Sequence, residues 1–283
     1  MGEKKRLTTQ DILKDKIPIT GSNVVADYKS LILIPLFTLA FLLTLSANLW
    51  YFDRLISERN WYDIMILPLN LYGEVWLFTL VSAGLSALSV IILKKIHPIN
   101  IGIFDLNTKE GKEEFKYYKL RYWCSYYALW VGRATPLPWA DMLIFKMLGL
   151  NMGSNVCLYD SWMDVELVDI GDFVMTSLNT ALLSHVIYDD YFIQLPTVCS
   201  KNSITGGQSL VAPGTFLGEG GILGAACSTY MGQKLKGNLI HVGDPVRRTF
   251  PIRIGEKVPV QKKAEVKKDK KRKRRKKKDV STD

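Results

Sequence analysis

The sequence predicts a membrane-anchored protein with two transmembrane α-helices, interfacial helices, a left-handed parallel β-helix of about four coils, and a disordered basic tail. Three observations predict this fold class. The N-terminal third contains two long runs without a charged residue, the C-terminal half carries a six-residue repeat, and the last segment is dominated by lysine and arginine.

The charge distribution limits the classes of function. The chain of 283 residues has 37 basic and 27 acidic residues, but residues 257–283 alone hold 14 basic and 4 acidic ones. The remaining 256 residues are therefore neutral overall, which excludes a chain-wide basic surface for nucleic acid. The four cysteines have no Cys-x-x-Cys spacing, which disfavours a zinc site or a disulfide scaffold and fits a reducing compartment. They are Cys124, Cys157, Cys199 and Cys227.

Residues 31–50 and 75–93 contain no charged residue. Each run is long enough to cross about 30 Å of hydrocarbon as a helix, so we expect a transmembrane hairpin over residues 30–96, after an N-terminal segment 1–29. The alternative is a pair of buried core helices. A signal peptide is disfavoured, because the first run starts thirty residues into the chain and lacks a small-x-small cleavage site.

The basic residues around these runs predict an orientation. Six precede the first run and seven occur in residues 94–121, whereas only Arg54 and Arg59 lie between the runs. Because cytoplasmic flanks carry the excess of lysine and arginine, we expect both termini and the β-helix on the cytoplasmic side.

Residues 97–150 form the expected helical linker. Tyrosine, tryptophan and basic residues alternate over residues 115–133, Pro136 and Pro138 interrupt the pattern, and a second helix is expected near residues 139–148. This composition favours helices lying in the cytoplasmic headgroup layer, where basic side chains meet lipid phosphates. The alternative is two helices packed on the soluble domain.

The six-residue repeat predicts the β-helix over residues 151–254. From Cys199 the chain divides without gaps into CSKNSI, TGGQSL, VAPGTF, LGEGGI and LGAACS. The first position is expected to point into a narrow core. Small residues, glycine above all, are expected in the tight turns, because glycine tolerates positive φ. Residues 188–198 interrupt the phase, which predicts an excursion loop. An ordinary all-β domain with chance glycine spacing is the alternative.

The run from Leu210 to Ala226 resembles the hexapeptide-repeat acyltransferase superfamily, in which an aliphatic-x-Pro-Gly segment leads into aliphatic-Gly-acidic-Gly. The segments 133–136 and 148–153 resemble a membrane-associated branch that includes the C-terminal region of ε-poly-lysine synthetases and related non-ribosomal peptide synthetases. Leu183-Ser184-His185 is similar to the Leu-x-Gly-His segment of that branch, with Ser184 in place of glycine. The resemblance covers about residues 115–248 and implies acyl transfer.

The chemistry of acyl transfer indicates candidate catalytic residues. A base must remove a proton from the attacking group, and histidine suits this role because its pKa is near neutrality. Of the three histidines, only His185 falls at the position that the resemblance implies for catalysis, so His185 is the predicted general base. Asp189 or Asp190 is the predicted orienting group for its imidazole. A structural histidine is the alternative.

The resemblance also implies acetyl-CoA, or another acyl-CoA, as co-substrate. Candidate cofactor-binding residues are of two kinds, glycines with accessible backbone N–H groups and lysines able to contact phosphates: Gly206, Gly207, Gly224, Lys234 and Lys236. Arg247 and Arg248 are weaker candidates of the second kind. No metal is expected, because the spacing of the histidines does not supply a three-histidine site.

The sequence thus predicts a membrane-bound acyltransferase acting on a polar or lipid-linked acceptor at the cytoplasmic face. The alternatives are a non-catalytic membrane scaffold and an amide-bond-forming module. Expected partners are membrane lipids, through the spans and the polybasic tail 255–283, and further copies of the chain as a dimer or trimer. A nucleic-acid partner or a localisation signal is a less favoured interpretation of the tail.

Overall fold

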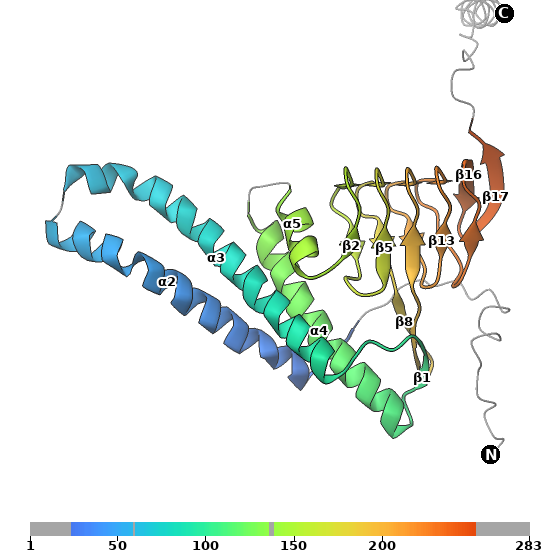
Figure 1. Ribbon diagram of the computed structural model, residues 1–283, viewed down its shortest axis with the longest axis horizontal. Coiled ribbons are helices and arrows are strands. Elements are labelled where there is room, and N and C mark those ends of the chain that lie inside the picture. Colours follow the sequence, from blue (N-terminus) through green and yellow to red (C-terminus); the bar gives the residue numbers. More distant parts are fainter. Residues whose placement is uncertain (1–23, 59, 136–138, 253–283) are drawn as a thin grey trace, which may run out of the picture. The chain divides into compact units, whose positions relative to one another are not determined.

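Figure 1 shows the computed structural model of the chain, which describes residues 24–58, 60–135 and 139–252. The chain divides into two compact units, Met1–Phe250 and Pro251–Asp283. Nearly all of the second unit lies outside the described residues. The predictions for the polybasic tail and for most of the N-terminal segment therefore fall outside them too.

The first half of the described chain is helical. A 3-10 turn, η1 (Tyr28–Ile32), leads into α2 (Leu33–Glu58) and α3 (Trp61–Ile96), and the helices α4 (Lys109–Arg133) and α5 (Ala140–Met147) follow. The predicted runs lie within η1–α2 and within α3. Among the described residues these two helices are long and apolar enough to cross a membrane, judged by length and composition.

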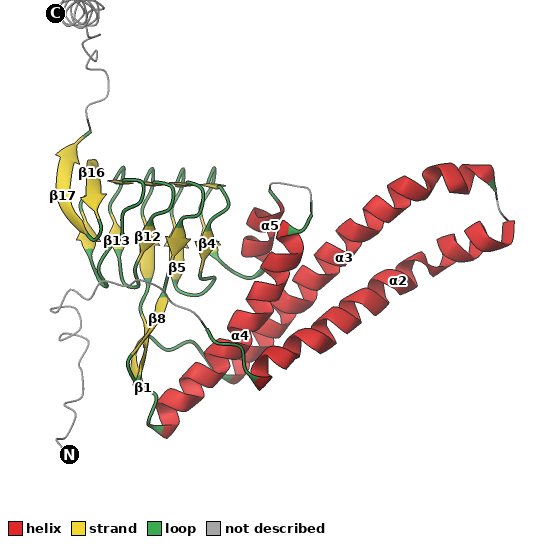
Figure 2. Ribbon diagram, turned by 180° about the vertical axis from the view of Figure 1, so that it is seen from behind, coloured by secondary structure: helices red, strands yellow, loops and turns green. Residues whose placement is uncertain are grey.

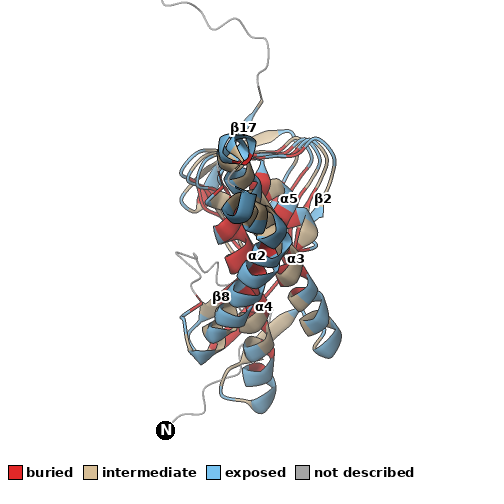
Figure 3. Cartoon of the chain, turned by 90° about the vertical axis from the view of Figure 1, so that its left-hand side faces the viewer, coloured by how far each residue is buried: buried red, intermediate tan, exposed pale blue. Residues whose placement is uncertain are grey.

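Helix α2 buries only one stripe of side chains. Leu36, Ala40 and Thr44, each four residues apart, face inwards, while exposed positions predominate along the rest of the helix (Figure 3). Phe37 of α2 meets Phe78 of α3 edge to face, with ring centroids 5.7 Å apart. Up to Trp50 the exposed side chains of α2 are mostly apolar and none is charged, which is the surface that a lipid environment favours over water.

Several hydroxyl groups on these helices are bonded within their own helix. The Thr44 hydroxyl donates to the Ala40 carbonyl, and the Thr79 hydroxyl donates to the Val75 carbonyl, both over 2.8 Å. Such back-bonding removes the cost of placing a hydroxyl among apolar groups.

The second half of the chain winds into a three-sided parallel β-helix (Figure 2). One sheet has the order β2-β5-β10-β13-β15, the second β3-β6-β11-β14-β16-β17, and the third β4-β7-β12. The bounds of these strands are β2 Asn151–Met152, β3 Cys157–Leu158, β4 Trp162–Met163, β5 Val168–Ile170, β6 Met175–Thr176, β7 Ala181–Leu182, β10 Thr197–Cys199, β11 Ile204–Thr205, β12 Leu210–Val211, β13 Phe216–Leu217, β14 Ile222–Leu223, β15 Lys234–Leu235, β16 Leu239–Gly243 and β17 Val246–Pro251.

The six-residue repeat places the core side chains as predicted. Its first positions are all buried: Cys199, Thr205, Val211, Leu217 and Leu223. Strand partners are eighteen residues apart within uninterrupted coils, as in the pairs Met152 with Ile170 and Leu217 with Leu235. Three six-residue segments therefore complete one coil and return the chain to the same sheet, where backbone groups of successive coils bond to one another.

The residues that form the corners of the coils are mostly not the expected glycines. Left-handed backbone at stacked corner positions is adopted by Asn155, Phe173, Asn202, Gly220 and Asn238. Asparagine tolerates this conformation because its short polar side chain bonds locally. Most of these left-handed corners are thus made without glycine.

An excursion interrupts the β-helix where the repeat loses phase. Strands β8 (His185–Tyr188) and β9 (Tyr191–Gln194) form an antiparallel hairpin, and β9 also pairs with β1 (Gly102–Asp105). The excursion is confirmed, but β1 was not predicted. Its four residues are too few to show a clear alternation of polar and apolar side chains.

Helix α4 packs against both the other helices and the β-strands. It contacts α2, α3, α5, β1 and β9, and its Cys124 and Ala128 belong to one buried cluster with α3 and the β-helix. The linker therefore packs on the folded domain, which was the alternative interpretation of residues 97–150. Placement of its exposed residues, such as Trp130, in a headgroup layer stays a prediction.

Candidate active site

A cavity of about 550 Å³ lies between α4 and the sheet β4-β7-β12. On α4 most of its lining residues recur three or four positions apart, and the full set is Tyr118, Arg121, Tyr122, Trp123, Ser125, Tyr126 and Leu129. This spacing gathers them on one face of the helix. The β-helix contributes the opposite wall from three successive coils: Trp162, Met163, Asp164, Val165, Glu166, Ala181, Leu183, His185 and Leu210.

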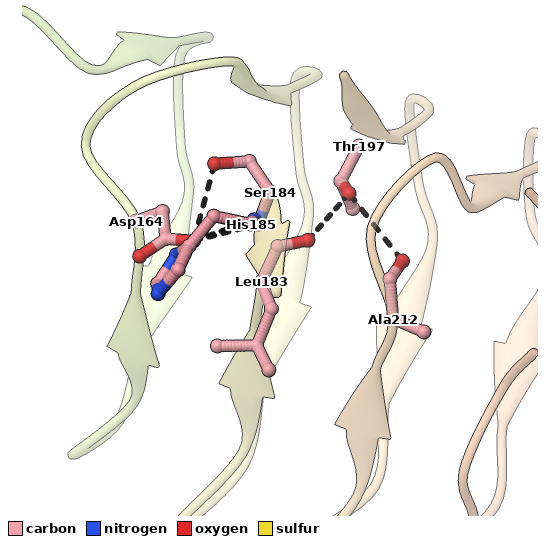
Figure 4. A network of polar contacts seen from close by, with 6 residues as sticks. All are labelled: Asp164, Leu183, Ser184, His185, Thr197 and Ala212. Atoms are coloured by element: carbon pink, nitrogen blue, oxygen red, sulfur yellow. Dashed lines mark hydrogen bonds and ion pairs between the residues drawn. The ribbon is translucent and has the colours of Figure 1, made fainter. Parts of the chain in front are cut away.

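His185 enters this cavity because the chain leaves the β-helix there. Leu182 ends β7 opposite Met163, so the next residues of the two coils, Asp164 and Leu183, remain side by side. The chain then turns away at Ser184 and starts the excursion at His185. The hydroxyl of Thr197, at the point of return, donates to the Leu183 carbonyl over 2.6 Å and ties both ends of the excursion together (Figure 4).

One carboxylate oxygen organises the departing chain. Oδ2 of Asp164 accepts from the backbone N–H of Ser184 at 2.7 Å and of His185 at 3.2 Å, and from the Ser184 hydroxyl at 3.1 Å (Figure 4). It also lies 2.6 Å from Nδ1 of His185. A carboxylate can only accept, so Nδ1 carries the proton in this pair and the lone pair of the neutral imidazole is on Nε2.

The other imidazole nitrogen has no partner among the described residues. His185 is 1% exposed, and its Nε2 is a buried atom without a hydrogen bond. A buried nitrogen with a free lone pair is costly unless a ligand meets it, because most buried polar atoms in folded proteins are bonded. A carboxylate holds Nδ1 and leaves the lone pair of Nε2 free. A histidine that acts as a base has this arrangement.

Two tyrosines of α4 lie beside the imidazole. The ring of Tyr118 is 4.7 Å and that of Tyr122 is 6.2 Å from the His185 ring. Burial raises the pKa of Tyr118 well above its ordinary value, with the charges of Asp164 and Glu166 adding to the effect. Burial likewise raises the pKa of Tyr122 to about 12. Both phenols therefore keep their protons and remain hydrogen-bond donors at neutral pH.

A buried ion pair completes the polar part of the cavity. Nε of Arg121 lies 2.6 Å from Oε1 of Glu166, and Nη1 of Arg121 donates to the His97 carbonyl at 3.3 Å. Nη2 of Arg121 and Oε2 of Glu166 are buried and have no partner among the described residues. The pair thus offers one spare donor and one spare acceptor inside the cavity.

The predicted orienting groups of the histidine lie elsewhere. Asp189 and Asp190 form the turn between β8 and β9, at the other end of the strand that starts with His185. Asp164 holds the imidazole instead, so the assignment of Asp189 or Asp190 is corrected. The sequence signal for Asp164 is its place one coil before the departure point.

The five candidate cofactor residues do not line this cavity. The N–H of Gly206 donates to the Leu223 carbonyl and that of Gly224 to the His241 carbonyl, each over 2.8 Å, so both N–H groups are used between coils. A Cβ on Gly206 would lie 2.4 Å from the backbone nitrogen of Ala225. Close approach of coils accounts for this glycine. The remaining candidates, Gly207, Lys234 and Lys236, stay predictions.

Lys234 and Lys236 are exposed, on and after the strand β15. The other two histidines are also outside the cavity. The His97 ring stacks on Tyr117, and Nε2 of His241 bonds the Lys236 carbonyl at 2.8 Å. In the described part of the chain, no three His, Cys, Asp or Glu side chains are grouped as metal ligands would be.

No family model matches the sequence, and no curated protein is similar to it. Solved structures similar in fold include a hexapeptide-repeat acetyltransferase from Vibrio cholerae, at 15% identity and a TM-score of 0.34 over 40% of this chain and 80% of that one. A maltose O-acetyltransferase from Clostridium difficile matches at 19% identity and a TM-score of 0.31, over 40% and 74%.

AntD, an N-acyltransferase from Bacillus cereus in complex with dTDP and 3-hydroxybutyryl-CoA, matches at 18% identity and a TM-score of 0.30, over 46% of this chain and 93% of that one. All three TM-scores are below 0.5.

Proposed function

We propose that this chain is an acyltransferase in which His185 removes a proton from the acceptor while an acyl group passes from acyl-CoA. The observation that carries the proposal is the buried, unpartnered Nε2 of His185 in a polar cavity, with Nδ1 held by Asp164. The six-residue repeat and its family resemblance support the choice of an acyl-CoA donor. Acetyl is the simplest donor group to test.

The reaction follows from these atoms. Nε2 of His185 takes the proton of an acceptor hydroxyl or amine as the acceptor oxygen or nitrogen attacks the thioester carbonyl. The tetrahedral intermediate collapses, the C–S bond breaks, and the imidazolium returns the proton to the departing thiolate of coenzyme A. The negative charge of Asp164 stabilises the imidazolium in between. Products are the acylated acceptor and free coenzyme A.

Tyr118 is the candidate donor to the developing oxyanion. Its hydroxyl is buried and unpartnered among the described residues, and its raised pKa keeps it protonated. A neutral phenol beside the imidazole stabilises negative charge on the acyl oxygen without competing for the acceptor proton.

We further propose that α2 and α3 anchor the chain in a membrane, with both termini and the β-helix on the cytoplasmic side. The basic flanks of the two runs and the exposed apolar face of α2 support this. The tail would then lie near anionic lipids. Assembly into dimers or trimers is carried over from the resemblance alone.

The test uses the full chain in detergent with radiolabelled acetyl-CoA and an extract of the source cells. We expect His185→Gln to lower label transfer by about 100-fold or more, because general-base catalysis contributes at least that much. His97→Gln is the matched control, since its imidazole is outside the cavity. Unchanged transfer by His185→Gln, or no binding of acetyl-CoA by calorimetry, would overturn the proposal.

The same experiment separates the alternatives. A non-catalytic scaffold predicts no label transfer by the wild-type chain. Transfer to an amine gives a labelled amide that survives mild alkali, whereas an acetylated hydroxyl is an ester and is released as acetate, so alkali treatment separates amide-bond formation from ester formation.

A further inference from the structure

We infer that the acceptor is an amphiphile, with an uncharged, hydroxyl-bearing headgroup in the His185 cavity and a hydrocarbon chain in a groove between α2 and α4. The inference rests on the proposed acyl transfer at His185 and names the acceptor class. It is carried by a second, apolar space that adjoins the polar cavity.

The apolar groove has a volume of about 460 Å³. Leu33, Ile34 and Phe37 line it from α2, and Tyr126, Tyr127 and Trp130 line it from α4. On each helix the second and third of these residues lie one and four positions after the first. The three side chains therefore share one face of the helix and form a continuous stripe. The Tyr127 hydroxyl is 3.2 Å from the Ser82 hydroxyl of α3, so the polar end of this side chain is bonded outside the lining.

Tyr126 joins the two spaces. Its side chain lines both the groove and the His185 cavity. On α4 the cavity is lined by Tyr122, Ser125 and Leu129, and the groove by Tyr127 and Trp130, so Tyr126 sits where the two stripes meet. Both spaces therefore border the same side chain, and we infer that a molecule with a polar end and an apolar end occupies both, with its junction beside Tyr126.

A lipid chain is the occupant that fits the groove. Within the described ranges, α2 is one of two helices apolar enough to cross a membrane, and the side chains of Ile34 and Phe37 on it are 62% and 46% exposed. Hydrocarbon in a bilayer around α2 reaches these side chains without passing through water. A water-soluble acceptor would leave the groove unused.

The charges of the cavity indicate the headgroup. The spare donor on Arg121 and the spare acceptor on Glu166 belong to one ion pair, so their charges cancel. A hydroxyl satisfies both, accepting from Arg121 and donating to Glu166. The carboxylate of Asp164 adds a further negative charge to the lining, so a phosphate is disfavoured. The ring of Tyr126 is stacked beside Trp162, 6.2 Å between centroids, and this aromatic wall suits a sugar-like ring.

The test is photo-crosslinking of the full chain in lipid nanodiscs with a dodecyl β-glucoside that carries a diazirine in its alkyl chain. We expect crosslinks to map to residues 33–38 and 126–130. Excess dodecyl β-glucoside should compete, and glucose or dodecyl phosphate should compete poorly. Crosslinks spread evenly along α2 and α3, or equal competition by dodecyl phosphate, would overturn the inference.

A pair of variants makes the mapping specific. Thr38 lines the groove and Leu39, its neighbour on α2, does not. Thr38→Trp fills the groove and should lower the crosslink yield several-fold, whereas Leu39→Trp places the same side chain on the adjacent face and should leave the yield unchanged. Equal yields from both variants would exclude the groove as the binding site.

The outcome is separable from that of the proposed function. Crosslinking requires neither acyl-CoA nor His185, so a groove-specific crosslink with transfer unaffected by His185→Gln would overturn the reaction and leave the ligand class standing. In the label-transfer assay, a His185-dependent product is expected to extract into chloroform–methanol. A His185-dependent product found only in the aqueous phase would overturn the amphiphile and leave the reaction standing.

Discussion

Asp164 lies 2.6 Å from Nδ1 of His185, although the two residues are on successive coils and twenty-one positions apart in the chain. The same oxygen accepts the N–H groups of Ser184 and His185, so it both turns the chain out of the β-helix and sets the tautomer of the imidazole. The fold of the excursion and the chemistry of the site therefore depend on one carboxylate.

Asp164→Asn tests this dependence. An amide can bond Nδ1 through either its oxygen or its nitrogen, so the tautomer with a free Nε2 is no longer enforced, and we expect acyl transfer to fall by about 100-fold or more. The rate is measured as release of free coenzyme A. Asp169→Asn is the control, because Asp169 bonds the Asn151 side chain near the start of the β-helix. Equal rates for the two variants would contradict the role of Asp164.

The raised pKa of Tyr122 predicts that the folded protein loses stability at alkaline pH. Its pKa of about 12 in the fold exceeds the value near 10 of an unfolded tyrosine, so between these pH values the unfolded state releases a proton that the folded state keeps. The contribution of Tyr122 is complete below about pH 10 and is lost as pH rises towards 12. Thermal unfolding followed by intrinsic fluorescence should show this decline.

Tyr122→Phe removes the titrating group and should flatten that decline. Because Tyr118 titrates in the same direction, Tyr118→Phe should flatten it as well, and the double variant more than either. An alkaline decline that is the same in all four proteins would show that other groups cause it.

The burial of the Arg121–Glu166 ion pair predicts that substitutions at these two residues have strongly coupled effects on the free energy of unfolding. Both side chains are buried, so Arg121→Met or Glu166→Met alone leaves one uncompensated charge, and we expect each to lower the free energy of unfolding by about 3–5 kcal/mol. The double variant removes both charges and should be closer to the wild type than either single variant. A double-mutant cycle by denaturant titration measures the coupling. Additive losses would indicate that the two charges act independently.

Gly206→Ala distinguishes coil stacking from cofactor binding. The new Cβ would approach the backbone of Ala225 to 2.4 Å, so we expect a loss of roughly 1–3 kcal/mol of stability through displacement of the next coil. Gly84→Ala in α3 is the control, since a Cβ there meets nothing within 4 Å. A variant that keeps its unfolding midpoint but loses acetyl-CoA binding would instead restore Gly206 as a cofactor residue.

The elements with strong local patterns could be predicted from the sequence. Uncharged runs indicated α2 and α3, and the six-residue repeat indicated which side chains fill the β-helix, from Cys199 to Leu223. The interruption of the repeat at residues 188–198 indicated the excursion, which in the structure begins at His185. These predictions succeeded because a repeated environment, such as a narrow core, selects the same kind of residue at a regular interval.

The expectation for the turns failed for a physical reason. Glycine was expected for left-handed backbone, whereas asparagine fills many of those corners and Gly206 is explained by the closeness of the next coil. Composition alone does not separate these two demands on a small residue. The structure separates them because it shows both the backbone angle and the neighbouring atoms.

By itself the sequence determined the helical hairpin, the spacing of the coils and His185 as the candidate base. The tertiary structure decided that Asp164, and neither Asp189 nor Asp190, holds the imidazole, and that Arg121 and Glu166 meet in the same cavity. The reason is the range of the interactions. Periodicity is local and leaves its mark along the chain, whereas a hydrogen bond between a helix and a coil, or across an excursion, depends on how distant segments are brought together.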